Sequence, residues 1–364
     1  MRSYNHLWEK YISEENYYTA VENAVRHKGG KKRKYRAARY FRENMEKLKD
    51  AFITYAANFK NDFHHPKYIY DGIRKKKRLI LVPTMREQVI HHMIVNVMQP
   101  IFMRGMYEHS YGSLPGRGAH DAKKVIERWI GKKDRNFKYI LKMDIKKYFD
   151  TIPHDILKQK FARLIHDPRF LDLLYEIIDV VPGNKGIPIG FYTSQWFANW
   201  YLQDLDHFIK EDLEAVYYIR YMDDMVIIGP NKRRLHQIKR EVERYLNDEL
   251  GLELKNNWQV YRFNYQDKGR DLDFMGFRFF RNRTILRKNI LLKLWRKARK
   301  IAKSGIRNIH VCRQMTSYLG WLSITDTYQF YKSRIKPLIS FRALIRYMSR
   351  WQREQNKEVL YALV

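Results

Sequence analysis

Two adjacent carboxylates, Asp223 and Asp224, lie between two apolar runs of the chain. The upstream run is Val216–Ile219 and the downstream run is Met225–Gly229, a pattern that predicts a β-hairpin with the carboxylates at its tip. Neighbouring carboxylates repel each other, and a divalent cation that neutralises them is one reason for such a pair to occur. An ordinary acidic turn is the alternative, so other residues must distinguish the two.

A third carboxylate, Asp144, interrupts the short apolar segment 139–145, which has the pattern of a strand. A carboxylate in such a segment is costly unless it is paired or bound to a metal. A helical insertion separates it from Asp223, so the strand and the hairpin could lie side by side in one sheet. Three carboxylates would then meet. Two Mg²⁺ ions held there, or Mn²⁺ in their place, would activate a primer 3′-hydroxyl and stabilise the leaving pyrophosphate.

The charge of the chain indicates a polyanionic partner. Its 71 Lys and Arg against 39 Asp and Glu give a net charge of +32, and an aromatic content of 15% adds surface for base stacking. An anionic membrane is the alternative, but no apolar run reaches the roughly 18 residues of a spanning helix, and we expect no signal peptide. Cys312 is the only cysteine, which excludes internal disulfides and zinc ribbons and suits a reducing cytoplasm.

The order of predicted elements indicates an α+β fold, because hairpins outnumber βαβ units. Hairpins are expected over residues 68–84, 216–229 and 272–280, and helices over 1–60, 86–101, 119–131, 153–165, 196–208, 235–246 and from 286 onward. The basic segment Lys28–Lys34 breaks the first helical region and is either a solvated connection or a phosphate contact. Gly251 is expected to end the helix that precedes it.

Five short motifs, in this order along the chain, resemble those of reverse transcriptases over nearly all of the sequence after residue 60. Arg78–Ile80 resembles the fingers segment, the Gly/Pro loop 111–118 resembles that of bacterial enzymes related to group II intron proteins, and residues 142–149 resemble motif A. Residues 190–195 resemble motif B and Tyr221–Asp224 resembles motif C. The resemblance implies a right-hand polymerase fold and RNA-directed DNA synthesis from deoxynucleoside triphosphates.

The same resemblance implies a division of the chain into four parts. Residues 1–67 would form an N-terminal helical extension and residues 68–138 the fingers. Residues 139–285 would form the palm, with a finger insertion near 153–185, and residues 286–364 a basic helical thumb.

Metal-site roles are also implied by the resemblance. Asp144, Asp223 and Asp224 would be the catalytic residues that hold two Mg²⁺ ions, or Mn²⁺ as a substitute, with the carbonyl of Ile145 near one of them. A catalytically silent RNA-binding scaffold would not require all three carboxylates, which disfavours that alternative.

Nucleotide-binding roles fall on five further residues. Arg78 would contact the triphosphate, and Phe149 would exclude a ribose 2′-hydroxyl, which disfavours an RNA-directed RNA polymerase; core packing is the alternative for Phe149. Gly190 would allow close approach to the nascent base pair beside Ile189. Lys255 would protonate pyrophosphate, or it is simply a surface lysine.

Nucleic-acid contacts are expected from basic side chains of the loop and the thumb. Residues 274–276 would form the primer grip. The basic residues expected to follow phosphates of an RNA–DNA hybrid are Arg117, Lys288, Arg296, Lys297 and Lys300.

The form Ile189–Gly190 followed by Ser194–Gln195 resembles reverse transcriptases of diversity-generating retroelements, which copy a template RNA with errors at adenines. Phage-defence reverse transcriptases are similar in these segments, so an antiviral role with a dedicated noncoding RNA is the alternative. The expected partners are a structured noncoding template RNA, the cDNA product, dNTPs, and either a small accessory protein or further copies of the chain. No membrane partner is expected, and the expected location is the cytoplasm.

Overall fold

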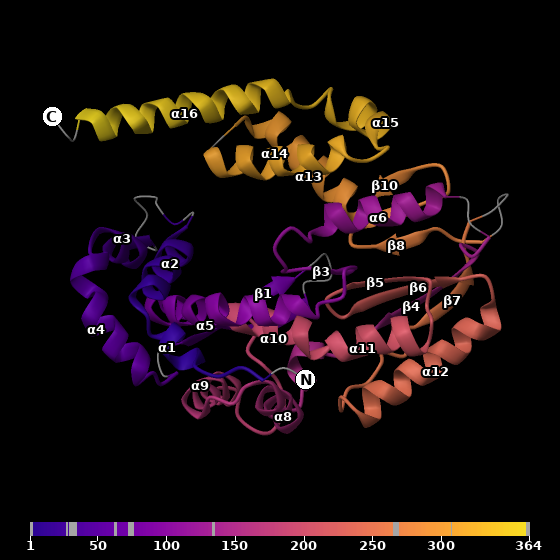
Figure 1. Cartoon of the computed structure of the whole chain (residues 1–364). Helices are drawn as coiled ribbons and strands as arrows, with labels where there is room; N and C mark the ends of the chain where they lie inside the picture. Colours follow the sequence, from indigo (N-terminus) through magenta and orange to yellow (C-terminus); the bar gives the residue numbers. More distant parts are fainter. Residues whose placement is uncertain are drawn as a thin grey trace. The chain divides into compact units, whose positions relative to one another are not determined.

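A computed structural model describes residues 3–26, 28, 35–61, 64–71, 76–132, 135–264, 269–306 and 308–361 (Figure 1). The chain forms two compact units. Unit 1 comprises Met1–Ala122 and Lys138–Val260, and unit 2 comprises Lys123–Phe137 and Tyr261–Val364.

Unit 1 opens with four helices, α1 (Leu7–Tyr11), α2 (Glu14–Val25), α3 (Arg36–Glu43) and α4 (Met45–Ala57). The antiparallel hairpin of β1 (His65–Asp71) and β2 (Lys76–Val82) follows, and then the long helix α5 (Met85–Arg104). Helix α5 begins at a capping box, in which Thr84 and Glu87 each accept a hydrogen bond from the other's backbone N–H. Helices α1 and α2 pack against α5, and α3 and α4 pack against α2 (Figure 1).

The central sheet has five strands in the order β3-β5-β6-β4-β7. Their bounds are β3 Ser110–Tyr111, β4 Tyr139–Asp144, β5 Tyr217–Tyr221, β6 Asp224–Gly229 and β7 Gln259–Arg262. Strands β5 and β6 form the predicted hairpin, and β4 pairs antiparallel with β6. Helix α12 (Lys232–Asp248) packs against β4 and β6 (Figure 1).

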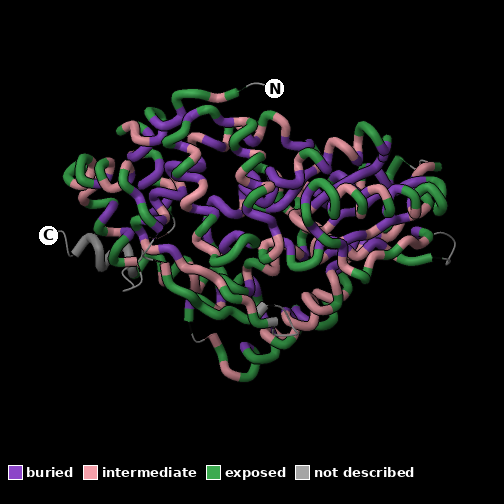
Figure 2. Tube along the Cα trace, turned by 90° about the horizontal axis from the view of Figure 1, so that it is seen from below, coloured by how far each residue is buried: buried purple, intermediate pink, exposed green. Residues whose placement is uncertain are grey.

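Helices between β4 and β5 supply much of the core of unit 1. They are α7 (Tyr148–Thr151), α8 (His154–Leu164), α9 (Pro168–Ile178), α10 (Tyr192–Tyr201), α11 (Gln203–His207) and the π-helix Phe208–Asp212. Eight of the ten residues of α10 are buried, including Trp196 and Trp200, whose rings lie 6.1 Å and 5.3 Å from that of Phe102 on α5. Figure 2 shows buried residues in purple along the trace. The aromatic core therefore fixes α10 against α5.

Unit 2 is a three-stranded sheet followed by helices. Its sheet has the order β10-β9-β8, with β8 Leu272–Phe274, β9 Phe277–Phe279 and β10 Thr284–Leu286. The two residues between β8 and β9, Met275 and Gly276, both have positive φ, as a tight hairpin turn requires. Helices α13 (Lys288–Ser304), α14 (Ile309–Ser323), α15 (Tyr328–Phe330), the π-helix Tyr331–Ile335 and α16 (Phe341–Tyr361) follow. Helix α6 (Ala119–Gly131) lies mostly in this unit.

The predicted α+β class is confirmed, as are the hairpins and the helices of unit 1. The last helical region was placed slightly wrongly, because Leu286 ends strand β10 and α13 begins at Lys288. The first hairpin begins at His65, earlier than predicted. Most of the basic segment Lys28–Lys34 lies outside the described residues. The boundaries of the two compact units differ from those predicted for fingers, palm and thumb. Compactness does not test a functional division, and the predicted division into four parts stays a prediction.

Within the described residues, no helix has both the length and the apolarity needed to cross a membrane.

The loop before α10 is joined to β2 by backbone contacts. The Leu81 N–H donates to the Ile189 carbonyl at 2.8 Å. Gly190 has φ +118, and a Cβ atom placed there would lie 2.2 Å from the Leu81 carbonyl oxygen. Glycine is therefore required by the neighbouring strand itself, before any substrate is considered.

We predict that Gly190→Ala lowers the free energy of unfolding by about 3 kcal/mol, since it adds a backbone clash to the strain of a positive φ. Gly183→Ala is the matched control, because Gly183 has φ +99 with nothing within 4 Å of the added Cβ, and we expect a loss of about 1 kcal/mol. Urea unfolding of both variants measures the difference. Equal losses would show that the contact with Leu81 does not constrain the loop.

Candidate active site

The register of the central sheet gathers three carboxylates at one end of it. Asp144, the last residue of β4, lies directly opposite Asp224, the first residue of β6. Asp223 lies in the turn between β5 and β6, and its carbonyl accepts a hydrogen bond from the Ile145 N–H at 3.2 Å. The prediction that strand and hairpin lie side by side is confirmed. Asp144, Ile145, Asp223 and Asp224 thus come from segments far apart in the sequence and meet at one point.

The ionised forms of Asp223 and Asp224 are disfavoured by burial and by the neighbouring charge of Asp144. Burial, together with the nearby charge of Asp144, raises the pKa of Asp223 to about 6. Burial likewise raises the pKa of Asp224 to about 6; Lys142 opposes this shift, while Asp144 and Asp223 reinforce it. Raised carboxyl pKa values of this origin mark a place where negative charge accumulates without full compensation.

Two lysines partly offset that charge. The Lys142 Nζ lies 3.5 Å from Asp224 Oδ2, and the Lys255 ammonium contacts Asp144 Oδ1. Lys255 is held in place by its backbone, because its N–H donates to the Asp144 carbonyl at 2.8 Å and the preceding Leu254 forms a bridge with Ile145. Lys255 therefore lies at the carboxylates rather than on a remote surface, whereas Lys142 is a site residue that sequence reasoning did not assign.

The carboxylates suit a hard divalent cation. Asp224 Oδ1 is buried and has no hydrogen-bond partner, which leaves one oxygen available for a ligand. Among the described residues, no three His, Cys, Asp or Glu side chains form a ready-made metal cage. Here Asp144 contacts Lys255 instead. Mg²⁺ is usually held by a few carboxylates together with substrate phosphates rather than by a complete protein cage, so the donor set fits that ion.

Residues predicted to bind the nucleotide lie on several elements. Phe149, at the start of α7, is half-buried, and its ring packs 5.8 Å from that of Tyr148, so it contributes to the core. Ile189 and Gly190 lie in the loop that β2 holds. Arg78 is on β2, opposite Ile69 of β1. The roles of these residues stay predictions.

Residues predicted to bind nucleic acid are spread over both units. The Arg117 Nη1 donates to the Tyr107 carbonyl at 2.7 Å, an intramolecular role in the Gly/Pro loop. On α13, Lys297 donates to Gln314 at 2.6 Å. Lys288, Arg296 and Lys300 are exposed on the same helix, as phosphate contacts would require, and this role too stays a prediction.

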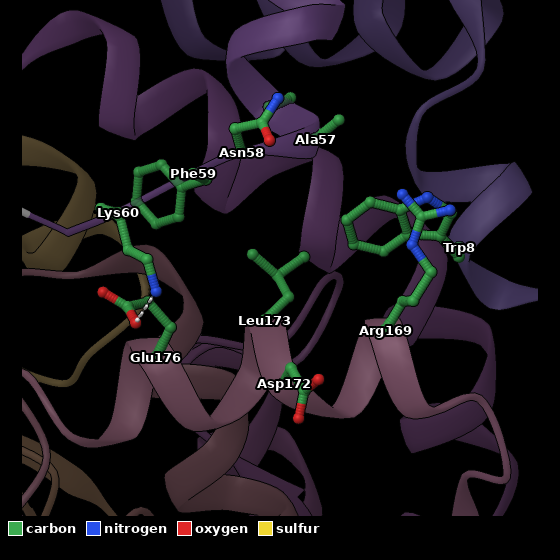
Figure 3. A pocket seen from close by; sticks show the side chains of 10 residues that line it. Trp8, Ala57, Asn58, Phe59, Lys60, Arg169, Asp172, Leu173 and Glu176 are labelled. Atoms are coloured by element: carbon green, nitrogen blue, oxygen red, sulfur yellow. Dashed lines mark hydrogen bonds and ion pairs between the residues drawn. The ribbon is translucent and has the colours of Figure 1, made fainter.

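A separate pocket of about 320 Å³ lies between α1, the end of α4 and α9 (Figure 3). In it, the Arg169 guanidinium lies 4.3 Å from the ring centre of Trp8, and Lys60 lies 3.3 Å from Glu176. Both cations thus have partners within the wall. None of the predicted site residues lines this pocket, so the carboxylate turn is the stronger candidate site.

Comparison with known proteins agrees with the geometry. A family model described as reverse transcriptase (RNA-dependent DNA polymerase) matches residues 60–279. Protein YkfC of Escherichia coli K12 is 25% identical over 250 residues, which cover 57% of this chain and 65% of that protein. The group II intron-encoded protein LtrA of Lactococcus lactis subsp. cremoris is 25% identical over 221 residues, covering 57% and 36%.

A third relative is the retron Ec73 reverse transcriptase of Escherichia coli, 25% identical over 211 residues, which cover 52% of this chain and 62% of that protein. The matched part of this chain thus spans less than two thirds of each of these three relatives.

We predict that Asp223→Asn stabilises the metal-free protein. The folded-state pKa of Asp223 is raised above its unfolded value, so the ionised carboxylate lowers stability as pH rises from about 4 through 6. Removing the charge should raise the free energy of unfolding by about 1 kcal/mol at pH 8 in EDTA, and the gain should vanish toward pH 4. Asp172→Asn, at an exposed site on α9, is the control. A loss of stability at pH 8 in Asp223→Asn would contradict the electrostatic account.

Proposed function

Because the chain belongs to the reverse transcriptase family, we propose that it is an RNA-directed DNA polymerase that extends a primer with dNTPs on an RNA template. The family match covers the segment that carries all three carboxylates. The observation that carries the proposal is the strand register that sets Asp144 opposite Asp224, beside a turn that presents Asp223. Two Mg²⁺ ions bound there would supply activation of the primer 3′-hydroxyl and neutralisation of the leaving pyrophosphate.

The protein's own groups would hold and balance this charge. Asp144, Asp223 and Asp224 would provide the oxygen ligands. Asp224 Oδ1 is buried without a hydrogen-bond partner, so a bound cation would supply the partner that this oxygen lacks. When Lys255 no longer pairs with Asp144, its ammonium group could donate a proton to an oxygen of the leaving pyrophosphate. Phe149 would restrict the sugar by bulk alone, since its half-buried ring is already held by core contacts.

The polymerase needs a polyanionic template, and the net charge of +32 supports a structured noncoding RNA as that partner. The exposed basic residues of α13 are the expected contacts with the hybrid. A small accessory protein or further copies of the chain would complete the assembly. The template and the accessory partner are proposed on charge and resemblance.

The primer-extension assay tests this function. With a DNA primer on an RNA template and Mg²⁺, the wild type should incorporate dNTPs and discriminate against NTPs. Asp223→Ala should lose about a thousandfold or more, since a metal ligand supports several kcal/mol of transition-state stabilisation. Asp172→Ala serves as the control and should keep wild-type activity. No dNTP incorporation by the wild type, or equal activity in Asp223→Ala, would defeat the proposal.

We further propose low-fidelity synthesis of the diversity-generating kind, with a phage-defence enzyme as the alternative. Support comes from Ile189 beside Gly190, where an apolar side chain replaces a polar one that could hydrogen-bond near the base pair. The backbone contact of Ile189 with Leu81 does not depend on its side chain, so the position can be changed without breaking that link.

Sequencing of cDNA made from a defined RNA tests the fidelity. We expect errors concentrated at template adenines in the wild type, and a several-fold drop in those errors in Ile189→Gln. Ile187→Val, a buried change in the same loop, is the control and should leave the error pattern unchanged. A uniformly low error rate in the wild type would contradict the proposal of a diversity-generating enzyme and favour the alternative of a phage-defence enzyme.

A further inference from the structure

A buried ionic cluster lies directly behind the turn that carries the carboxylates. Arg220, the residue before Tyr221, has no exposed surface, and neither has Asp206 on α11. The guanidinium donates to both carboxylate oxygens of Asp206, with Nε–Oδ1 at 2.7 Å and Nη2–Oδ2 at 2.5 Å. The hydroxyls of Tyr218 and Ser110 also donate to Asp206, at 2.6 Å and 2.8 Å. The buried charge is therefore fully paired.

The rest of the guanidinium reaches the turn itself. Nη1 donates to the Met222 carbonyl at 3.1 Å and to Asn199 Oδ1 at 3.3 Å. Asn199 in turn donates to the Gly112 carbonyl at 2.9 Å, and its Nδ2 lies 3.3 Å from the Met222 sulfur. One cation thus connects α10, α11 and the Gly/Pro loop to the residue that precedes Asp223.

Met222 is held in an unfavourable backbone conformation. Its φ is +54, which costs a non-glycine residue about 1–2 kcal/mol and persists only where the surroundings fix it. The Met222 N–H donates to the Tyr111 carbonyl at 3.0 Å, and its carbonyl accepts from Arg220. Both polar groups of this residue are therefore fixed. The peptide plane between Met222 and Asp223 sets the direction in which Asp223 leaves the turn.

We propose that Arg220 is a positioning residue, which with Asp206 and Asn199 fixes the Met222 carbonyl and thereby aims the Asp223 carboxylate for cation binding. This inference rests on the proposed polymerase function. A purely structural pair between Arg220 and Asp206 would need only the two bonds to Asp206. The additional hydrogen bond, from Arg220 to the Met222 carbonyl, links this pair to the site.

The test uses Arg220→Lys in the chain of 364 residues. A lysine keeps a positive charge beside Asp206, but a single ammonium cannot reach Asp206, Asn199 and Met222 together. We expect the midpoint of Mn²⁺ binding, measured by electron paramagnetic resonance without primer or nucleotide, to rise about tenfold. We also expect kcat for dNTP incorporation to fall about tenfold or more, with KM for dNTP within twofold of the wild type.

A second variant distinguishes the loss of positioning from a loss of folding caused by an unpaired buried charge. Arg220→Met combined with Asp206→Asn leaves no unpaired buried charge, and it should show the same shift in Mn²⁺ binding. Lys160→Met is the control, because the mostly buried Lys160 side chain pairs with the exposed carboxylate of Asp204 at 2.7 Å and makes no contact with the turn. It should lower the melting temperature and leave the Mn²⁺ midpoint unchanged.

An Mn²⁺ midpoint within twofold of the wild type in both Arg220 variants would overturn the inference, whatever their melting temperatures. Because Mn²⁺ binding is measured without catalysis, it decides the role of Arg220 independently of primer extension. Failure of the wild type to extend a primer would count against the proposed function alone.

Discussion

The antiparallel pairing of β4 with β6 is the constraint on which the rest of the site depends. Hydrogen-bond register fixes which residues face each other, so Asp144 opposite Asp224 is a consequence of the whole run of pairs from Tyr139 with Gly229 onward. The β6 residues from Met225 to Gly229 are all buried, so a slip by one residue would move each apolar side chain to the opposite face of the sheet, away from the neighbours against which it packs. The core of the sheet thus determines where the carboxylates meet.

This arrangement concentrates negative charge, and basic residues at two distances from the carboxylates compensate for it. Lys142 and Lys255 lie against the carboxylates, and Arg220 lies behind the turn with its own carboxylate partner. The lysines are partly exposed, whereas Arg220 is wholly buried. Groups with these two degrees of burial suit different tasks. Partly exposed lysines can exchange their partner for a cation or a phosphate, and a buried, fully paired arginine keeps its geometry.

Much of the site followed from the sequence because it depends on local patterns. Apolar runs on both sides of Asp223–Asp224 predicted the hairpin, and the cost of an acid within a strand singled out Asp144. Other parts depend on contacts distant in the sequence. The position of Lys255 beside Asp144 depends on the bridge between Ile145 and Leu254, which the periodicity of the sequence does not reveal. Arg220 has a signal in the sequence, because a charge inside an apolar strand requires a buried partner, but only the fold identifies Asp206 as that partner among the other acids.

We propose that Asp144, Asp223 and Asp224 together hold the catalytic cations. A structure of the protein with a primed RNA template, a non-hydrolysable dNTP and Mn²⁺, with anomalous diffraction, measures this directly. The account predicts anomalous peaks about 2.0–2.3 Å from oxygens of all three carboxylates, with Lys255 no longer bound to Asp144. Peaks that avoid one of the three carboxylates, or a Lys255–Asp144 ion pair that persists beside bound nucleotide, would contradict it.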